Sequence, residues 1–228
     1  INKIKFKTSK TIKLELKDAY HPCIENEIVT NTVDMSNNKI ITGPNAAGKT
    51  TLLKTTVINV LLAQQIGYSF CKSGSLSPFD YIHCYLNIPD TNARDSLFQA
   101  EARRCSNILN FIETHKTAKH FCIFDELFSG TNPYEAVATA YGYLSYISKN
   151  PNIRFMLTTH YIRLCKLFKK TKNIENANME TKLINDTPRY SYKIVKGISK
   201  IKGGIMVLRQ LHYPEKIIEE ANNIIQNL

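Results

Sequence analysis

The sequence lacks any uninterrupted apolar stretch that approaches the roughly 18 residues of a membrane-spanning helix. It also lacks a basic segment followed by an apolar run and a small-residue cleavage site, which is the pattern of a secretory leader. Both absences argue against membrane and secreted proteins. We therefore expect a soluble, intracellular protein, in the cytoplasm or the nucleus, with no membrane partner.

Cysteine is present without any arrangement that carries chemistry. The six cysteines are scattered, with no Cys-x-x-Cys pair and no spacing typical of a metal site. Such thiols are ordinary in a reducing compartment. Repeats, low-complexity segments and obvious linkers are absent as well. At 228 residues and 43% hydrophobic, the chain can bury one sizeable core but is short for two full domains.

Positive charge is concentrated in the last third of the chain. Of the net charge of +11, all falls within residues 149–216, which contain 15 Lys and Arg against 4 Asp and Glu. Such a region suits nucleic acid or an acidic partner, and it equally suits a solvated surface. No aromatic residues interleave with these charges as in single-strand binding proteins. Whether the region contacts DNA stays open.

What the sequence does contain is a phosphate-binding loop of the pattern G-x-x-x-x-G-K-[ST]. It follows an apolar, strand-like run at 40–42 and precedes a long helical pattern that starts at Lys49. Its glycines let backbone N–H groups surround phosphate oxygens, and the helix N-terminus adds partial positive charge. Lys49 is expected to reach the β- and γ-phosphates, and Thr50 to bind Mg²⁺. The residues expected to contact the nucleotide here are Gly43, Pro44, Asn45, Ala46, Ala47, Gly48, Lys49, Thr50 and Thr51.

Two acids follow a second apolar run, at 120–124. Asp125 and Glu126 stand at the carboxyl end of that predicted strand, where ligands gather in open α/β sheets. Asp125 can hold the Mg²⁺ that also contacts Thr50, and Glu126 can orient or deprotonate an attacking water. At the end of the next buried strand stands His160, which can sense the γ-phosphate.

Strands alternate with helices along the chain, so we expect an α/β fold with a mostly parallel sheet flanked by helices. Alternating apolar residues before residue 40, including 28–33, predict an antiparallel β portion on the N-terminal side. The tail predicts a hairpin (181–183 with 190–195) and two helices, the last opening at Pro214. We expect one domain over 1–228, divided into the β portion (1–39), a nucleotide-binding core (40–170) and a C-terminal hairpin with helices (171–228). Because the chain begins with Ile1 rather than Met, we expect it to be the C-terminal part of a longer protein.

The order of these motifs is that of P-loop NTPases of the ABC type. Three stretches, Gly43–Thr51, Asp125–Thr131 and Thr159–Tyr161, resemble those of the C-terminal ATPase domain of the MutS DNA mismatch-repair family. Asp95–Glu101 is similar to that family's S-T-F-x-x-E signature, with Leu97 in place of Thr. Segments 192–197, 203–205 and 213–218 resemble its closing section, so the resemblance covers roughly 20–225.

This resemblance implies a Mg²⁺-dependent ATPase that dimerises around ATP and drives mismatch or lesion recognition on double-stranded DNA. The partner would be an identical chain or a MutS-like one, and DNA would be held mainly by upstream domains. Carried over by position, Asn45 would help place nucleotide and water, Glu126 would be the catalytic carboxylate and His160 a switch residue. Ser96 would reach the γ-phosphate bound by the second subunit.

The resemblance also implies which residues hold the base, and this sequence departs from the family pattern in two further places. Tyr192 would lie against adenine, with Ile28 near the opposite face, although an aliphatic side chain stacks less well than a ring. After the signature the chain reads Glu101-Ala102 where the family usually has Met, which is nearer to outlying MutS-like ATPases.

Two other functions remain open from the sequence. One is a MutS-like ATPase that acts on branched or recombining DNA, because the domains that would discriminate lie outside this sequence. The other is an ABC-type ATPase switch unrelated to DNA, such as the engine of a transporter. An engine of that kind would carry an L-S-G-G-Q-type signature before the acid pair, and this sequence has none.

Overall fold

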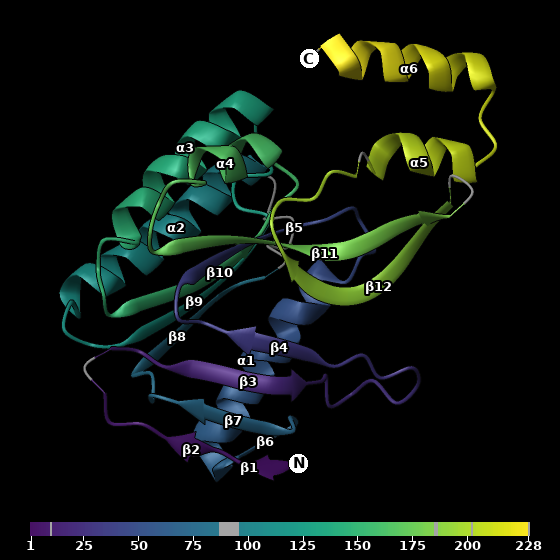
Figure 1. Ribbon diagram of the computed structural model, residues 1–228. Helices are drawn as coiled ribbons and strands as arrows, with labels where there is room; N and C mark the ends of the chain where they lie inside the picture. The colour runs from purple at the N-terminus through teal and green to yellow at the C-terminus, as the bar shows by residue number, and fades with distance from the viewer. Residues whose placement is uncertain (10, 87–95, 185–186, 202, 228) are drawn as a thin grey trace.

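The computed structural model describes residues 1–9, 11–86, 96–184, 187–201 and 203–227. Its centre is a six-stranded sheet with the strand order β12-β11-β5-β10-β9-β8 (Figure 1). All neighbouring strands are parallel except β11 and β12, which form an antiparallel pair. The expected α/β class with a mostly parallel sheet is therefore confirmed. The strands are β5 (Asn38–Thr42), β8 (Tyr81–Tyr85), β9 (His120–Asp125), β10 (Ile153–Thr158), β11 (Ile174–Ile184) and β12 (Thr187–Lys196).

Helices cover both faces of this sheet (Figure 1). Side chains alternate between the faces of a strand. In β9, Phe121 and Ile123 join the core that contains α1 (Lys49–Ile66). Cys122 and Phe124 join the opposite core, formed with the helices α2 (Leu97–Thr114), α3 (Pro133–Ile147) and α4 (Ile162–Leu167). Burial on both faces explains why β9 is a continuous apolar run.

A smaller sheet of order β2-β7-β3-β4 packs on the outer side of α1. β3 is antiparallel to both neighbours, as expected for the N-terminal portion, whereas β2 and β7 are parallel. β7 follows α1 in the sequence, and its Ser-Gly-Ser-Leu gives no strand signal. The expected strand at 28–33 is corrected to a start at Asn31, which leaves Ile28 in the preceding segment, 50% exposed. The bounds are β1 (Asn2–Lys3), β2 (Lys5–Phe6), β3 (Leu14–Ala19), β4 (Asn31–Asp34), β6 (Tyr68–Ser69) and β7 (Ser73–Leu76), with β1 paired to β6.

The C-terminal hairpin is longer than the sequence pattern predicts. The expected segment 181–183 is only the outer end of β11, whose residues 174–178 pair with β5 inside the main sheet. The polar residues Glu175, Asn176 and Asn178 interrupt both an apolar run and a regular alternation, so there is no clear strand signal here. After β12 come α5 (Gly203–Gln210) and α6 (Glu215–Asn227), the latter starting directly after Pro214 as predicted. Both helices project from the body (Figure 1). Among the described residues, no helix has the length and apolarity to cross a membrane.

Candidate functional site

Three chain segments meet at the carboxyl edge of the main sheet. Thr158 at the end of β10 is in register with Ile41 of β5 on one side and with Asp125 of β9 on the other. The segments that follow these three strands therefore start at the same level. This register places the phosphate loop after β5, Glu126 after β9 and His160 after β10 around one space.

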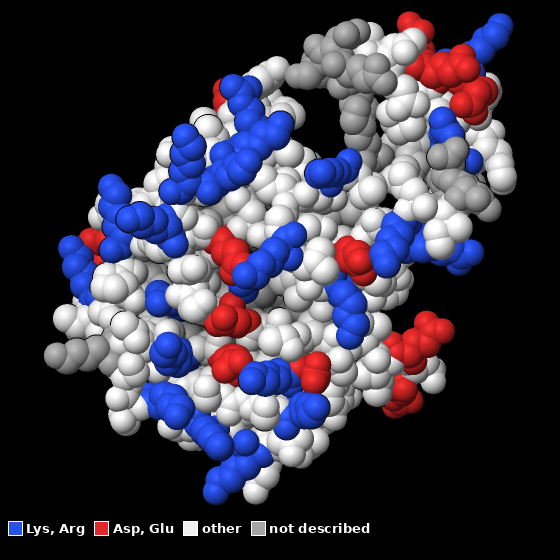
Figure 2. Space-filling view, viewed as in Figure 1, with Lys and Arg blue, Asp and Glu red and all other residues white. Residues whose placement is uncertain are grey.

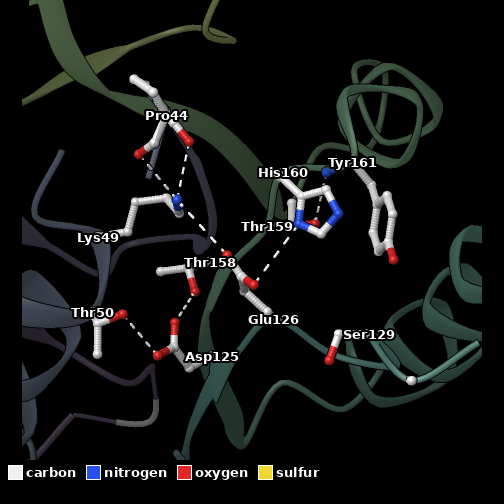
Figure 3. Close-up of polar contacts among 12 residues, drawn as sticks. Pro44, Lys49, Thr50, Asp125, Glu126, Ser129, Thr158, Thr159, His160 and Tyr161 are labelled. Carbon is white, nitrogen blue, oxygen red and sulfur yellow. Dashed lines mark hydrogen bonds and ion pairs between the residues drawn. The ribbon is translucent and has the colours of Figure 1, made fainter. Parts of the chain in front are cut away.

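Lys49, the first residue of α1, is held by the loop that precedes it. Its Nζ donates hydrogen bonds to the carbonyl oxygens of Gly43 (3.0 Å) and Pro44 (3.2 Å) (Figure 3). Gly48 caps α1 with φ 90°, a left-handed conformation that glycine adopts without strain. Burial lowers the pKa of the Lys49 ammonium, although Glu126 and Asp125 oppose this shift. The buried ammonium is fixed at the place where a phosphate is expected.

Asp125 is oriented through both carboxylate oxygens. Thr50 Oγ1 donates to one oxygen at 2.8 Å, and Thr158 Oγ1 donates to the other. The hydroxyl of Thr50 and the Asp125 carboxylate together form an all-oxygen donor set, which is the kind that Mg²⁺ prefers. Sequence reasoning did not identify Thr158. The only signal in the sequence was that Thr158 is a polar residue at the end of an apolar strand. Its pairing with Asp125 depends on the strand order.

Glu126 leaves β9 in a left-handed conformation, with φ 53°, so its side chain diverges from that of Asp125. Lys49 and His160 approach the carboxylate from two sides (Figure 3). Lys49 Nζ lies 3.8 Å from Oε1, and His160 Nδ1 lies 3.8 Å from Oε2. The nearby His160 lowers the pKa of Glu126, Lys49 lowers it further, and burial opposes both. The carboxylate is therefore ionised at neutral pH and able to accept a proton.

A cavity of about 550 Å³ lies between the phosphate loop and the segment that precedes β4. Tyr192 and Ile28 both line it, together with Glu126. The remaining predicted residues in its lining are Asn45, Ala46, Gly48, Lys49, Thr50 and Thr51. Gly43, Pro44, Ala47, Asp125, His160 and Ser96 lie outside the lining. The structure thus brings the two expected base contacts to the same cavity as the phosphate loop.

Ser96 is exposed and caps the N-terminus of α2. Its Oγ accepts from the N–H of Gln99 at 3.3 Å, and Gln99 Oε1 accepts from the N–H of Ser96 at 2.9 Å. This is a capping box, which satisfies two otherwise free N–H groups. Asp95, with which the signature-like stretch begins, lies outside the described residues.

Glu101, one turn into α2, ties this helix to the loop behind the acid pair. Its buried carboxylate accepts from the backbone N–H of Ser129 (3.0 Å), the hydroxyl of Ser129 (2.8 Å) and the N–H of Gly130 (3.0 Å). A Cβ on Gly130 would lie 2.7 Å from the backbone nitrogen of Phe98, so only glycine fits this approach. Glu101 is part of the stretch that resembles the family signature, but its hydrogen-bond partners depend on how α2 packs against the loop at 129–130.

We expect Glu101→Ala to lower the free energy of unfolding by about 2 kcal/mol, because the hydrogen bonds from Ser129 and Gly130 to this buried carboxylate are lost. Urea denaturation followed by circular dichroism measures this difference. Glu113→Ala is the matched control on the same helix, since Glu113 is only half-buried and pairs with the exposed Lys116; we expect a much smaller change there. Equal stability of wild type and Glu101→Ala would contradict the role of this carboxylate.

The basic region of the sequence forms part of the surface. Lys and Arg gather over α3 and α4 in Figure 2. Exposed lysines follow closely on one another at the end of α4 and in the turn after it, at Lys166, Lys169, Lys170 and Lys172. Contact of this surface with DNA stays a prediction.

The fold and these loops define an α/β protein with a phosphate-loop motif and an acid pair at one edge of a parallel sheet. Residues 39–228 match the family model MutS domain V, and the chain belongs to this family. Its relatives include proteins named DNA mismatch repair protein MutS. That of Persephonella marina is 29% identical over 93% of this chain. Those of Bacteroides fragilis and Aquifex pyrophilus are 31% and 30% identical over 94% and 95% of it. The chain spans about a quarter of their length, 25%, 26% and 26% respectively.

Proposed function

We propose that this chain is the ATP-binding and ATP-hydrolysing domain of a protein that acts in DNA mismatch repair. The observation that carries the proposal is the meeting of Lys49 and Glu126, 3.8 Å apart, beside a cavity lined by the phosphate loop. A buried cation and an ionised carboxylate at one loop suit a triphosphate and the water that attacks it.

The triphosphate is bound by the loop and the start of α1. Backbone N–H groups and the helix dipole attract phosphate oxygens, and Lys49 supplies a full charge. Thr50 and Asp125 would hold Mg²⁺, which supplies neutralisation of phosphate charge when bound. Tyr192 and Ile28, on the walls of the same cavity, are the groups available to the base.

Hydrolysis requires a group that takes a proton from water, and Glu126 is suited to that role. Its carboxylate is ionised at neutral pH, and His160 and Lys49 hold its pKa below the ordinary value. In the proposed reaction the water oxygen attacks the γ-phosphorus, the bond to the β–γ bridging oxygen breaks, and the water proton passes to Glu126. His160, whose side chain is 51% exposed, orients the second carboxylate oxygen and is open to the γ-phosphate.

The site is proposed to be shared between two chains. Ser96 is exposed at the start of α2 and does not line its own cavity. A serine at a helix N-terminus presents a hydroxyl and N–H groups that suit a phosphate on a second subunit. ATP bound between two copies would then favour a dimer in which the two sites are closed around the nucleotide, and hydrolysis would let that dimer open.

The names of the relatives support a role in mismatch repair, through segments beyond this chain that hold the DNA. We expect mismatched DNA to change ATP turnover by the full-length protein more than matched duplex does. Steady-state phosphate release with matched, mismatched and branched DNA, at one stated salt concentration, makes the comparison. If only branched DNA changed the rate, a role in recombination would be favoured over mismatch repair. If none of the three DNAs changed the rate, a DNA-linked function would be contradicted.

A further inference from the structure

Tyr192 occupies a strained point of β12. The pairing of β11 with β12 shifts between Met179, opposite Ile194, and Thr181, opposite Tyr190. Residue 180 therefore faces residues 191–193, which form a bulge. Within it Tyr192 has φ 56°, a left-handed conformation that is unfavourable for a residue with a side chain. The bulge turns the Tyr192 ring toward the phosphate loop. The ring lies so close to Gly48 that a Cβ on this glycine would be 3.1 Å from Tyr192 Cδ1.

The side chain of Asn31 holds this bulge from outside the hairpin. Its Nδ2 donates to the carbonyl oxygen of Tyr192 at 2.9 Å, and its Oδ1 accepts from the N–H of Ile194 at 2.8 Å. The amide thus pairs with two backbone groups at the bulge in the manner of a strand peptide. A neighbouring contact supports this one: Lys193, which follows Tyr192, donates from its Nζ to the carbonyl oxygen of Thr30, which precedes Asn31.

Asn31 also fixes the opposite wall of the cavity. It is the first residue of β4 and pairs with Ala19 of β3, so it anchors the segment that carries Ile28 to the N-terminal sheet. Asn31, Ile28 and Tyr192 line the same cavity. A single side chain therefore sets the separation of the two walls that face a base.

We propose that Asn31 is a positioning residue that gives the cavity its selectivity for a planar nucleobase, by clamping the bulge that presents Tyr192. This inference rests on the proposed function. Since both polar groups of the Asn31 amide are engaged by the backbone, it acts through the placement of the Tyr192 ring and not by reading the base. Phosphate is bound by the backbone of the loop at 43–50 and by Lys49, so we expect its binding to persist when the clamp is removed.

The test compares ATP with inorganic tripolyphosphate, which lacks the base, by calorimetry in the presence of Mg²⁺. For Asn31→Ala we expect the Kd of ATP to rise about tenfold, as for the loss of one or two hydrogen bonds, and the Kd of tripolyphosphate to stay unchanged. Asn31→Asp keeps the acceptor for Ile194 but faces the Tyr192 carbonyl with a second acceptor, so it should weaken ATP similarly.

Asn178→Ala is the matched control. Asn178 donates to Gly197 O at 3.1 Å on the same hairpin and does not line the cavity, so both affinities should match wild type. Adding Tyr192→Ala to Asn31→Ala should cause little further loss of ATP affinity, because the clamp acts through that ring. Equal weakening of ATP and tripolyphosphate, or additive losses in the double variant, would overturn the inference.

The rate of hydrogen exchange at the Ile194 amide measures the hydrogen bond to Asn31 in the absence of nucleotide. Asn31→Ala should speed this exchange, whereas Asn178→Ala should not; an unchanged rate would overturn the clamp itself. A wild-type chain that binds tripolyphosphate as tightly as ATP would overturn base selectivity alone. Failure of wild type to bind either ligand would instead contradict the proposed function.

Discussion

Glu126→Gln is expected to bind ATP as tightly as wild type and to hydrolyse it at least about 100-fold more slowly. The amide has nearly the same size and can still lie between Lys49 and His160, so the cavity keeps its shape. It cannot take a proton from water, because the ionised oxygen that Lys49 and His160 stabilise in the wild type is gone. Phosphate release at saturating Mg²⁺-ATP, together with a binding isotherm for ATP, separates the two effects.

The control for this variant is Glu113→Gln. Glu113 lies near the C-terminus of α2, where it pairs with Lys116 and accepts from the Tyr146 hydroxyl at the surface. Turnover by Glu113→Gln should equal that of wild type. Equal turnover by wild type and Glu126→Gln would remove Glu126 from the catalytic role. Loss of ATP binding in Glu126→Gln would show that the carboxylate serves the structure of the loop instead.

Lys49→Ala is expected to weaken ATP binding at least about 100-fold, below detection in an ordinary titration. The ammonium is the buried positive charge that faces the cavity from the start of α1. Without it the triphosphate would lie beside Asp125 and Glu126 with one fewer compensating cation. Calorimetry with ATP and with tripolyphosphate should show the same loss, because Lys49 acts on phosphate and not on the base.

Lys54→Ala on the same helix is the matched control, since Lys54 does not line the cavity. Its ATP affinity should match wild type. Removing Lys49 also removes two hydrogen bonds to the loop, so urea denaturation must accompany the titration. A folded Lys49→Ala protein with wild-type ATP affinity would contradict the assignment of the phosphate site.

The sequence could predict those parts of the site whose chemistry and local structure coincide in one short segment. The phosphate loop and the acid pair after β9 each combine a characteristic residue with the end of a strand or the start of a helix. The other contacts depend on which strands become neighbours. Thr158 reaches Asp125 because β10 lies between β5 and β9, and no periodicity in the sequence reports that order.

Long-range backbone partners were equally hidden. Asn31 meets the bulge of β12 across 161 residues of sequence, and Glu101 meets Gly130 across 29. The inner half of β11 is harder to predict because three polar residues among its first five leave neither an apolar run nor a regular alternation, although it pairs with β5 inside the sheet. Helix α4 has six residues, too few for a clear period.

The central claim is that two copies of this chain enclose one triphosphate between the phosphate loop of one and Ser96 of the other. A crystal structure of Glu126→Gln with Mg²⁺ and ATP tests it most directly. We expect the γ-phosphate to lie against Lys49 of one protomer and Ser96 of its partner, with the base beside Tyr192. A γ-phosphate enclosed by a single chain, with Ser96 directed away from any nucleotide, would contradict it.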